Sequence, residues 1–365
     1  MKKYYSLKKI LEKDCLYSII IGERSNGKSY SVLEKMLKNY LETGEEGAYL
    51  RRWDTDLQSG RCKTLFDSLM CNGKKENVIE KLSHGMYDRV VYYNRNFYLA
   101  FFDEKTKTTV KSPNPFVHTF ALNNMEHDKG SSFPKITTIF FDEFLTRGSY
   151  LPQEFVIFQN VISTIRRDRT NVKIFMAANT VELWSPYFDE MGLYRIKTMK
   201  PNSIDVYTYN NPHLTVAVEY TESVEKTKEE NAYSAFNNPR LKMISGGEWE
   251  IDIYPHAPFD IERKNILYTS YIKGVEKELY SVDYIFQNEC MFCYIHKKTT
   301  PLLEETTDII FQLDKSPREN FITSASSLNK VWLIFKKLYN DNKIFYENNK
   351  VGEMIRIFLK EFKRQ

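Results

Sequence analysis

Positions 22–31 read GERSNGKSYS, which holds the spacing of glycine, four residues, glycine, lysine and serine. Between a strand and a helix, this spacing is typical of a loop whose backbone N–H groups surround phosphates beside the positive end of the helix dipole. Gly22 and Gly27 permit the tight backbone, while Lys28 offers its ammonium group to the β and γ phosphates of a nucleotide. The hydroxyl of Ser29 is placed to reach Mg²⁺.

We expect the nucleotide to contact this loop throughout. The expected contact residues are Gly22, Glu23, Arg24, Ser25, Asn26, Gly27, Lys28, Ser29 and Tyr30. The competing interpretation is a solvated glycine turn with an exposed lysine. It is disfavoured because an apolar strand pattern precedes the loop and a helical pattern follows it.

A second motif, ITTIFFDE at 136–143, ends an apolar run with two acids. Asp142 follows a buried strand, where phosphate-loop proteins place the acid that holds Mg²⁺ through water. Glu143 can orient and deprotonate an attacking water molecule as a general base. An acidic pair at a strand end is also common as a solvated turn, but the upstream loop favours the site. The glutamate further favours ATP-driven motors over kinases and simple GTPases, which usually lack it.

A third segment, RRDRTNVKIFMAANT at 166–180, combines basic residues with an apolar strand. Arg166, Arg167 and Arg169 lie between a predicted helix and that strand, where a ring-shaped ATPase presents arginines to a neighbour's nucleotide. A basic helix end that interacts with its own dipole is an equally good interpretation. Asn179 ends the strand, where its side chain can sense the γ-phosphate, position water, or simply form a turn.

Alternating strand and helix patterns position these motifs in the first half of the chain. Strands are expected at 17–21, 48–52, 136–141 and 172–178, and helices after residue 29 and from 152 to 168. This order indicates an α/β fold with a mainly parallel sheet. Residues 89–121 are expected to form hairpin strands beside that sheet.

The character of the chain changes after about residue 200, and three parts are expected. Residues 1–205 would form the nucleotide-binding domain. Residues 206–258, which are largely polar and charged, would form a linker or a small helical subdomain. Residues 259–365 alternate short strand candidates with helical patterns and would form a small α+β domain without a motif of its own.

The composition limits the classes of function. The 365 residues include 52 Lys and Arg against 48 Asp and Glu, so the net charge of +4 is too small to indicate nucleic-acid binding without local patches. Five cysteines without a disulfide framework favour a reducing compartment. No apolar run approaches the roughly 18 residues of a membrane span, so we expect a cytoplasmic protein without membrane contact.

Together these motifs resemble those of the genome-packaging ATPases of small protein-primed podophages. That family is related to the large terminases, in the additional-strand, catalytic-glutamate branch of P-loop ATPases. The matching segments are GERSNGKSYS, AYLRRWDTDL, DKGSSFPKITTIFFDEF, RRDRTNVKIFMAANT with the following WSPYF, and more weakly NAYSAFNN. The resemblance covers most of the first 200 residues and the arrangement of the remainder.

The resemblance implies a P-loop ATPase that uses ATP and Mg²⁺ to package viral double-stranded DNA. It implies a homo-oligomeric, pentameric ring at the portal (connector) vertex of an empty capsid, in the host cytoplasm. Arg167 resembles the arginine that acts on the neighbouring subunit's nucleotide, and Arg169 matches that position less well. Lys129 resembles a second basic residue that acts across the interface, and Arg24 the extra basic residue of terminase-type loops.

The C-terminal domain of that family resembles an RNase-H-like nuclease that has lost its catalytic acids. Residues 262–365 contain Asp283, Asp308 and Asp314 but no cluster of acids at strand ends that would suit a two-metal nuclease. We therefore expect no DNA cleavage. This expectation suits a viral genome that is already of unit length.

DNA-contacting residues are harder to assign from the sequence. The candidates near the motifs are Arg51, Arg52, Arg61, Lys63 and Lys129. Ion pairs within the domain are an alternative role for Arg51 and Arg52. The basic end KEFKRQ, with Lys336 and Lys337, could bind the portal or a structural RNA, or only keep a helix soluble.

Two other classes of function remain open. A P-loop helicase, another nucleic-acid-dependent ATPase or a small-molecule kinase could carry the same loop, and stimulation by single-stranded rather than double-stranded DNA would indicate a helicase. A protein that binds nucleotide only in order to assemble would bind ATP without turnover. Such a protein would be unaffected by replacement of Glu143.

Overall fold

A computed structural model describes eleven segments of the chain. They are residues 4–71, 76–124, 132–146, 148, 150–180, 185–210, 213–222, 254–257, 260–275, 277–302 and 307–363. The chain divides into two compact units, Met1–Glu250 and Ile251–Gln365, which are described separately. Among the described residues, no helix is both long enough and apolar enough to span a membrane.

The first unit is built on a ten-stranded sheet. In spatial order its strands are β3 (Arg89–Tyr93), β4 (Asn96–Asp103), β6 (Val117–Ala121), β2 (Glu46–Arg51), β7 (Ile136–Asp142), β8 (Lys173–Asn179), β1 (Tyr17–Gly22), β10 (His213–Tyr220) and β9 (Ser203–Asn210), while β5 (Thr108–Lys111) pairs with β4 alone. All neighbours from β6 to β10 in this order are parallel. This confirms the expected α/β class with a mainly parallel sheet.

Two long helices cover opposite faces of the sheet. Ile19 and Ile21 of β1 share a core with α6 (Glu154–Arg166), whereas Ile20 shares a second core with α2 (Lys28–Thr43). Successive side chains of a strand point to opposite faces, so one continuous apolar run can supply both cores. The short helices of this unit are α1 (Lys8–Leu11), α3 (Ser59–Cys62), α4 (Asp67–Met70), α5 (Val78–Leu82) and α7 (Pro186–Glu190).

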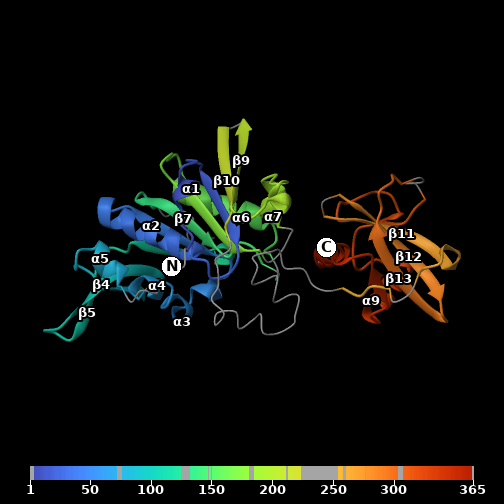
Figure 1. Cartoon of the computed structure of the whole chain (residues 1–365), viewed down its shortest axis with the longest axis horizontal. Coiled ribbons are helices and arrows are strands. Elements are labelled where there is room, and N and C mark those ends of the chain that lie inside the picture. The colour runs from blue at the N-terminus through green and yellow to red at the C-terminus, as the bar shows by residue number, and fades with distance from the viewer. Residues whose placement is uncertain are drawn as a thin grey trace. The chain divides into compact units, whose positions relative to one another are not determined.

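The region expected to form hairpins at 89–121 is divided between two roles. Strands β3, β4 and β5 are antiparallel, as expected. Residues 117–121 instead form β6, which pairs in parallel with β2 and so belongs to the central sheet. The ribbon of β4 and β5 projects from one end of the unit, and the ribbon of β9 and β10 projects from another (Figure 1).

The domain boundary expected at residue 205 is wrong, because it falls inside strand β9. The next strand, β10, pairs in parallel with β1 and completes the first sheet, with Val216 opposite Tyr17 and Tyr220 opposite Ile21. The alternating pattern of HLTVAVEY was the available signal for this strand. The linker expected at 206–258 therefore begins as sheet, and its residues 223–253 lie outside the described part of the chain.

In the described residues of the second unit, a six-stranded mixed sheet is accompanied by two α-helices. In spatial order the strands are β16 (Ile344–Tyr346), β13 (Cys290–Lys297), β12 (Leu279–Gln287), β11 (Ile266–Lys273), β14 (Ile310–Phe311) and β15 (Phe321–Ile322), and the helices are α9 (Lys330–Asn340) and α10 (Asn349–Phe362). The first three strands along the chain are antiparallel, and β14 and β15 then add in parallel. Buried Phe311, Trp332 and Phe358 belong to its core.

Candidate active site

The glycine-rich loop joins the end of β1 to the start of α2. Gly27 has a φ of 97°, a left-handed conformation that side chains disfavour. At Gly22 an added Cβ would lie 2.0 Å from Oγ1 of Thr221, so no larger residue fits without a shift. Asn26 donates a hydrogen bond of 2.7 Å to the same hydroxyl. The residue after β10 therefore supports the loop from behind, a contact that the sequence did not indicate.

Lys28 lies folded against its own loop. Its side chain is buried, and Nζ donates to the carbonyl oxygens of Gly22 at 3.3 Å and Glu23 at 2.5 Å. It also donates to Oδ1 of Asn179, 3.3 Å away. Burial lowers the pKa of Lys28 to about 8, although the nearby carboxylates of Asp142 and Glu23 oppose this shift. A largely desolvated ammonium group of this kind is suited to bind phosphate oxygens.

This lowered pKa predicts that the loop binds phosphate groups, here tested with ATP, more weakly at alkaline pH. Phosphates bind the ammonium form, and that form is lost as the pH rises through about 8. From pH 7 to pH 9 the affinity for ATP should fall about tenfold, as the protonated fraction falls from about nine tenths to one tenth. Binding measured by calorimetry tests this, with Lys28→Arg as a control that keeps its charge. A wild-type affinity that stays constant over this range would contradict the prediction.

The acids of the second motif lie beside the loop. The Ser29 hydroxyl donates to Oδ1 of Asp142 at 3.0 Å, and the Tyr49 hydroxyl donates to Oδ2 at 3.3 Å. Burial raises the pKa of Asp142, while Arg51 opposes that shift. A hydroxyl and a buried carboxylate this close are hard oxygen donors of the kind that Mg²⁺ prefers. The donor set therefore fits the expected Mg²⁺ ligands, Ser29 and Asp142.

Glu143 turns out of the end of β7 towards Arg51. Its φ is 56°, its side chain is 59% exposed, and its Oε2 lies 2.6 Å from a guanidinium nitrogen of Arg51. Arg51 is also 3.9 Å from Asp142 and 3.5 Å from Asp56. The carboxylate is thus accessible to water and held beside the loop by a cation, a position from which it could accept a proton from water.

A cavity of about 810 Å³ lies over the loop and the two acids. Of the residues expected to bind nucleotide or metal, it is lined by Arg24, Ser25, Asn26, Gly27, Lys28, Ser29, Tyr30, Asp142, Glu143 and Asn179, and Arg51 and Arg52, which were considered for DNA contact, line it as well. Gly22 and Glu23 are not among its lining residues; they contribute carbonyl groups to Lys28, and Glu23 is buried. Trp53 and Thr146 also line the cavity and were not expected.

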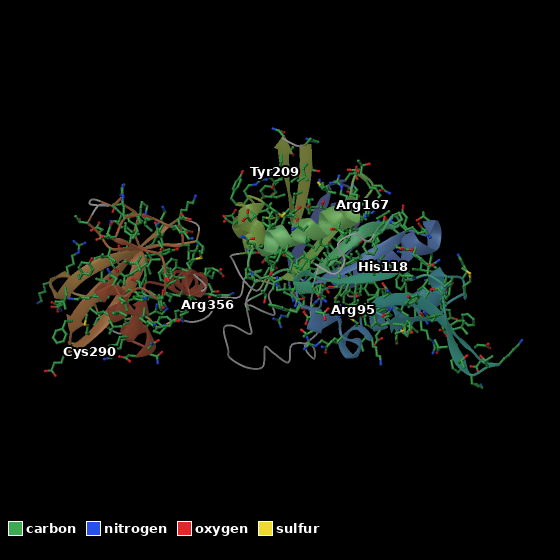
Figure 2. All side chains as sticks on the ribbon, turned by 180° about the vertical axis from the view of Figure 1, so that it is seen from behind. Arg95, His118, Arg167, Tyr209, Cys290 and Arg356 are labelled. Carbon is green, nitrogen blue, oxygen red and sulfur yellow. The ribbon has the colours of Figure 1, made fainter. Side chains whose placement is uncertain are left out.

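The arginines of the third segment lie at the opposite edge of the sheet from the loop. Arg167 follows the last residue of α6 and precedes the start of β8, whereas the end of β8 pairs with Gly22. The seven residues of β8 separate the two edges by roughly 20 Å. Figure 2 shows Arg167 at the end of α6, well apart from Arg95, which pairs with Asp54 beyond the other end of the parallel strands. Arg167 is exposed and cannot reach the loop of its own chain.

Arg169 is committed to the backbone and does not suit the expected nucleotide contact. Its guanidinium donates to the carbonyl oxygens of Phe133, Pro134, Ile136 and Ile165 at 2.6–3.0 Å. These bonds fasten the segment before β7 to the end of α6. The expectation that Arg169 binds nucleotide is therefore contradicted in this structure. Lys129, expected to act across an interface, lies outside the described residues.

The residues considered for DNA contact differ in how far their side chains are exposed. Arg52 is only 5% exposed and pairs with Glu154, so this structure contradicts a DNA contact for it. Arg51 is held by Glu143. Arg61 is exposed and pairs with Asp56 at 2.6 Å, and Lys63 is exposed, so these two remain candidates on the surface.

Comparisons with known proteins agree on one family. A family model described as Podovirus DNA encapsidation protein (Gp16) matches residues 1–97 and 117–235. The DNA packaging proteins of Bacillus phages phi29 and B103 are each 25% identical to the chain, over 189 and 187 residues. These matches cover 51% and 50% of the chain and 49% and 50% of those proteins, so the chain spans about half the length of the curated relatives it matches.

Two solved structures share the fold over nearly the whole chain. A chain of the bacteriophage Phi-29 viral genome packaging motor assembly gives a TM-score of 0.54 at 16% identity, with 99% of each chain covered. A chain of the Phi-28 gp11 DNA packaging motor gives 0.51 at 17% identity, with 99% of this chain and 98% of that one covered. Residues 98–116, which the family model skips, include the projecting strand β5.

Proposed function

The chain belongs to the podovirus DNA encapsidation protein family, as its motifs suggested, and we propose that it is an ATP-driven translocase that packages viral double-stranded DNA into an empty capsid. The observation that carries this proposal is the convergence of Lys28, Asp142 and Glu143 on one cavity. Strand β8 lies between β1 and β7, which supports the additional-strand, catalytic-glutamate type of P-loop ATPase.

In this proposal the cavity binds the triphosphate of ATP. Lys28 exchanges the carbonyls of its own loop for phosphate oxygens, and the loop N–H groups bind the phosphates. Ser29 and Asp142 would hold Mg²⁺, which supplies positive charge against the phosphates. Glu143 accepts the proton of the attacking water, and Asn179 at the end of β8 orients water or the γ-phosphate. To accept that proton, Glu143 must loosen its ion pair with Arg51.

The ring arrangement is supported by the placement of Arg167. An arginine at the far end of the strands from its own loop does not reach that loop, so a nucleotide contact by Arg167 has to be made in the site of a neighbouring copy. A head-to-tail interface of this kind generates a closed ring when the rotation between copies closes. We propose that the ring acts at the portal of the assembling virion in the host cell, with Lys129 on the same interface.

The second unit is proposed to be a degenerate RNase-H-like domain. Five of its six strands support this assignment, because they follow the order β13-β12-β11-β14-β15 with three antiparallel strands and then two parallel ones; the short sixth strand, β16, pairs in parallel with the outer side of β13. Asp283 on β12 is engaged by neighbours, since it accepts from Thr269 at 2.7 Å and lies 3.1 Å from His296. Among the described residues, no group of three or more acidic, histidine or cysteine side chains could hold a metal ion.

This assignment predicts that the protein does not cut DNA. With supercoiled plasmid and Mg²⁺ or Mn²⁺, no nicked or linear product should form, because two-metal cleavage needs a cluster of carboxylates. Gel electrophoresis after extended incubation measures this, with a metal-dependent nuclease as the positive control. Nicking that depends on Mn²⁺ and is lost in Asp283→Asn would contradict the assignment.

The proposed function is tested by the rate of ATP hydrolysis with and without double-stranded DNA and empty capsids. A packaging motor should hydrolyse ATP faster with both, and should protect the DNA inside the capsid from added nuclease. Stimulation by single-stranded DNA alone would instead indicate a helicase. Binding of ATP without turnover under every condition would indicate a nucleotide-dependent assembly protein.

A further inference from the structure

A buried ion pair lies directly behind the turn that carries Glu143. Arg52 and Glu154 are 5% and 1% exposed, and Nε of Arg52 donates to both carboxylate oxygens of Glu154 at 3.0 and 2.8 Å. Glu154 is itself held by the hydroxyl of Tyr187 at 2.8 Å and by the backbone N–H of Leu151 at 2.7 Å. The pair is therefore fixed by two further segments of the chain.

The remaining donors of Arg52 go to the turn after β7. One terminal nitrogen donates to the carbonyl oxygen of Phe144 at 2.6 Å, and the other to that of Glu143 at 3.4 Å. The guanidinium also lies over the ring of Tyr150, 4.9 Å from its centre. Arginine has a planar fork that can serve several acceptors at once, which a lysine ammonium on a flexible stem cannot reproduce.

The backbone that Arg52 holds is unusual. Glu143 has a φ of 56°, in the left-handed region that residues other than glycine rarely adopt unless surrounding contacts impose it. Such a conformation turns the side chain out of the strand direction, and here the carboxylate meets Arg51. Two adjacent residues of the chain thus contact Glu143. Arg51 binds its side-chain carboxylate, and Arg52 donates to its main-chain carbonyl group.

We propose that Arg52 and Glu154 are positioning residues that hold the main chain of Glu143 in the conformation that presents its carboxylate to the attacking water. This inference rests on the proposed function, in which Glu143 is the general base. It assigns Arg52 a role inside the protein in place of DNA contact. Because Glu154 is the first residue of α6, the start of this helix also helps to hold Glu143 in place through Arg52.

The first test is Arg52→Lys, measured with the full-length chain. The lysine keeps a positive charge opposite Glu154, so no unpaired charge is buried, but it cannot reach Glu154 and both carbonyl groups together. We expect kcat for ATP hydrolysis to fall on the order of 100-fold, which is the typical effect of moving a catalytic group by about 1 Å. The KM and the Kd for ATP should stay within about twofold of the wild-type values. A folded variant with wild-type kcat would overturn the proposal.

A second variant removes the ion pair without leaving a buried charge. In the double variant Arg52→Met with Glu154→Leu, apolar side chains of similar size replace both partners, an exchange that proteins often tolerate. The proposal expects a folded protein that binds ATP with a similarly reduced kcat. A matched control is Arg356→Met with Glu353→Leu, which removes the pair of 2.8 Å formed by buried Glu353 in the second unit. Equal losses of kcat in the two double variants would count against the proposal.

The outcomes also separate this inference from the proposed function. If Glu143→Gln hydrolyses ATP like the wild type, the assignment of the base has failed, and with it the proposed chemistry. If Glu143→Gln is inactive but Arg52→Lys is fully active, only the positioning role has failed. If the double variant does not fold, Arg52→Lys alone decides, with thermal unfolding and ATP binding as checks of its structure.

Discussion

Replacement of Glu143 by glutamine is expected to abolish nearly all ATP hydrolysis while leaving ATP binding intact. The glutamine keeps the size and polarity of the side chain but cannot accept a proton from water, and loss of a general base typically costs about 10²- to 10⁴-fold in rate. ATP binding should persist because Lys28, Ser29 and the loop backbone are unchanged. Hydrolysis measured by phosphate release, and binding measured by calorimetry, give the two quantities separately.

Lys28→Ala provides the contrast for this experiment. It should also abolish hydrolysis, but through loss of binding, because Nζ is the only side-chain ammonium that lines the described cavity. If Glu143→Gln lost ATP affinity to the same extent as Lys28→Ala, Glu143 would be a binding residue and not the base. Loss of turnover with firm binding would, in addition, exclude a protein that uses ATP only for assembly.

The loop and the two acids could be identified from sequence because local chemistry dictates them. Gly27 is required by the left-handed φ of its own turn, whereas the lack of room for a Cβ at Gly22 comes from Thr221, a distant residue that the motif does not reveal. Asp142 is the last residue of a fully buried strand and Glu143 follows it, and the carboxyl ends of parallel strands share one edge of the sheet. The sequence pattern could therefore locate the loop and the strand end that carries the two acids, because both are properties of a single segment.

Roles that depend on distant segments could not be predicted in this way. Arg51 and Arg52 are adjacent, chemically identical and both at the cavity, yet Arg51 binds the carboxylate of Glu143, whereas Arg52 is paired with buried Glu154 of a helix about 100 positions later. Arg167 and Arg169 differ similarly, because the backbone turns at Arg167, with a φ of 49°, and directs Arg169 onto carbonyl groups. Only the tertiary structure separates the members of each pair.

Arg167→Ala is expected to reduce hydrolysis strongly by disabling the site of the neighbouring subunit. An arginine that stabilises charge on the transferring phosphoryl group contributes about 10³- to 10⁵-fold in related enzymes. Arg167 is separated from its own loop by the length of β8, so the loss should appear only in the assembled ring. Hydrolysis is measured with DNA and empty capsids present. Arg195→Ala, which removes another exposed arginine of the first unit, serves as the control.

A mixture of two inactive variants distinguishes action on the neighbour from action within one chain. A subunit with Arg167→Ala keeps its own base, and a subunit with Glu143→Gln keeps its arginine. A complete site forms where a Glu143→Gln subunit supplies its Arg167 to the nucleotide site of a neighbouring Arg167→Ala subunit, which still has its own Glu143. In a random equal mixture roughly one quarter of the interfaces have this order, because a head-to-tail ring contact is directional. Recovery of hydrolysis in the mixture therefore requires that Arg167 acts across the interface. No recovery from two variants that assemble normally would mean that the arginine acts elsewhere, and the proposed shared site would be wrong.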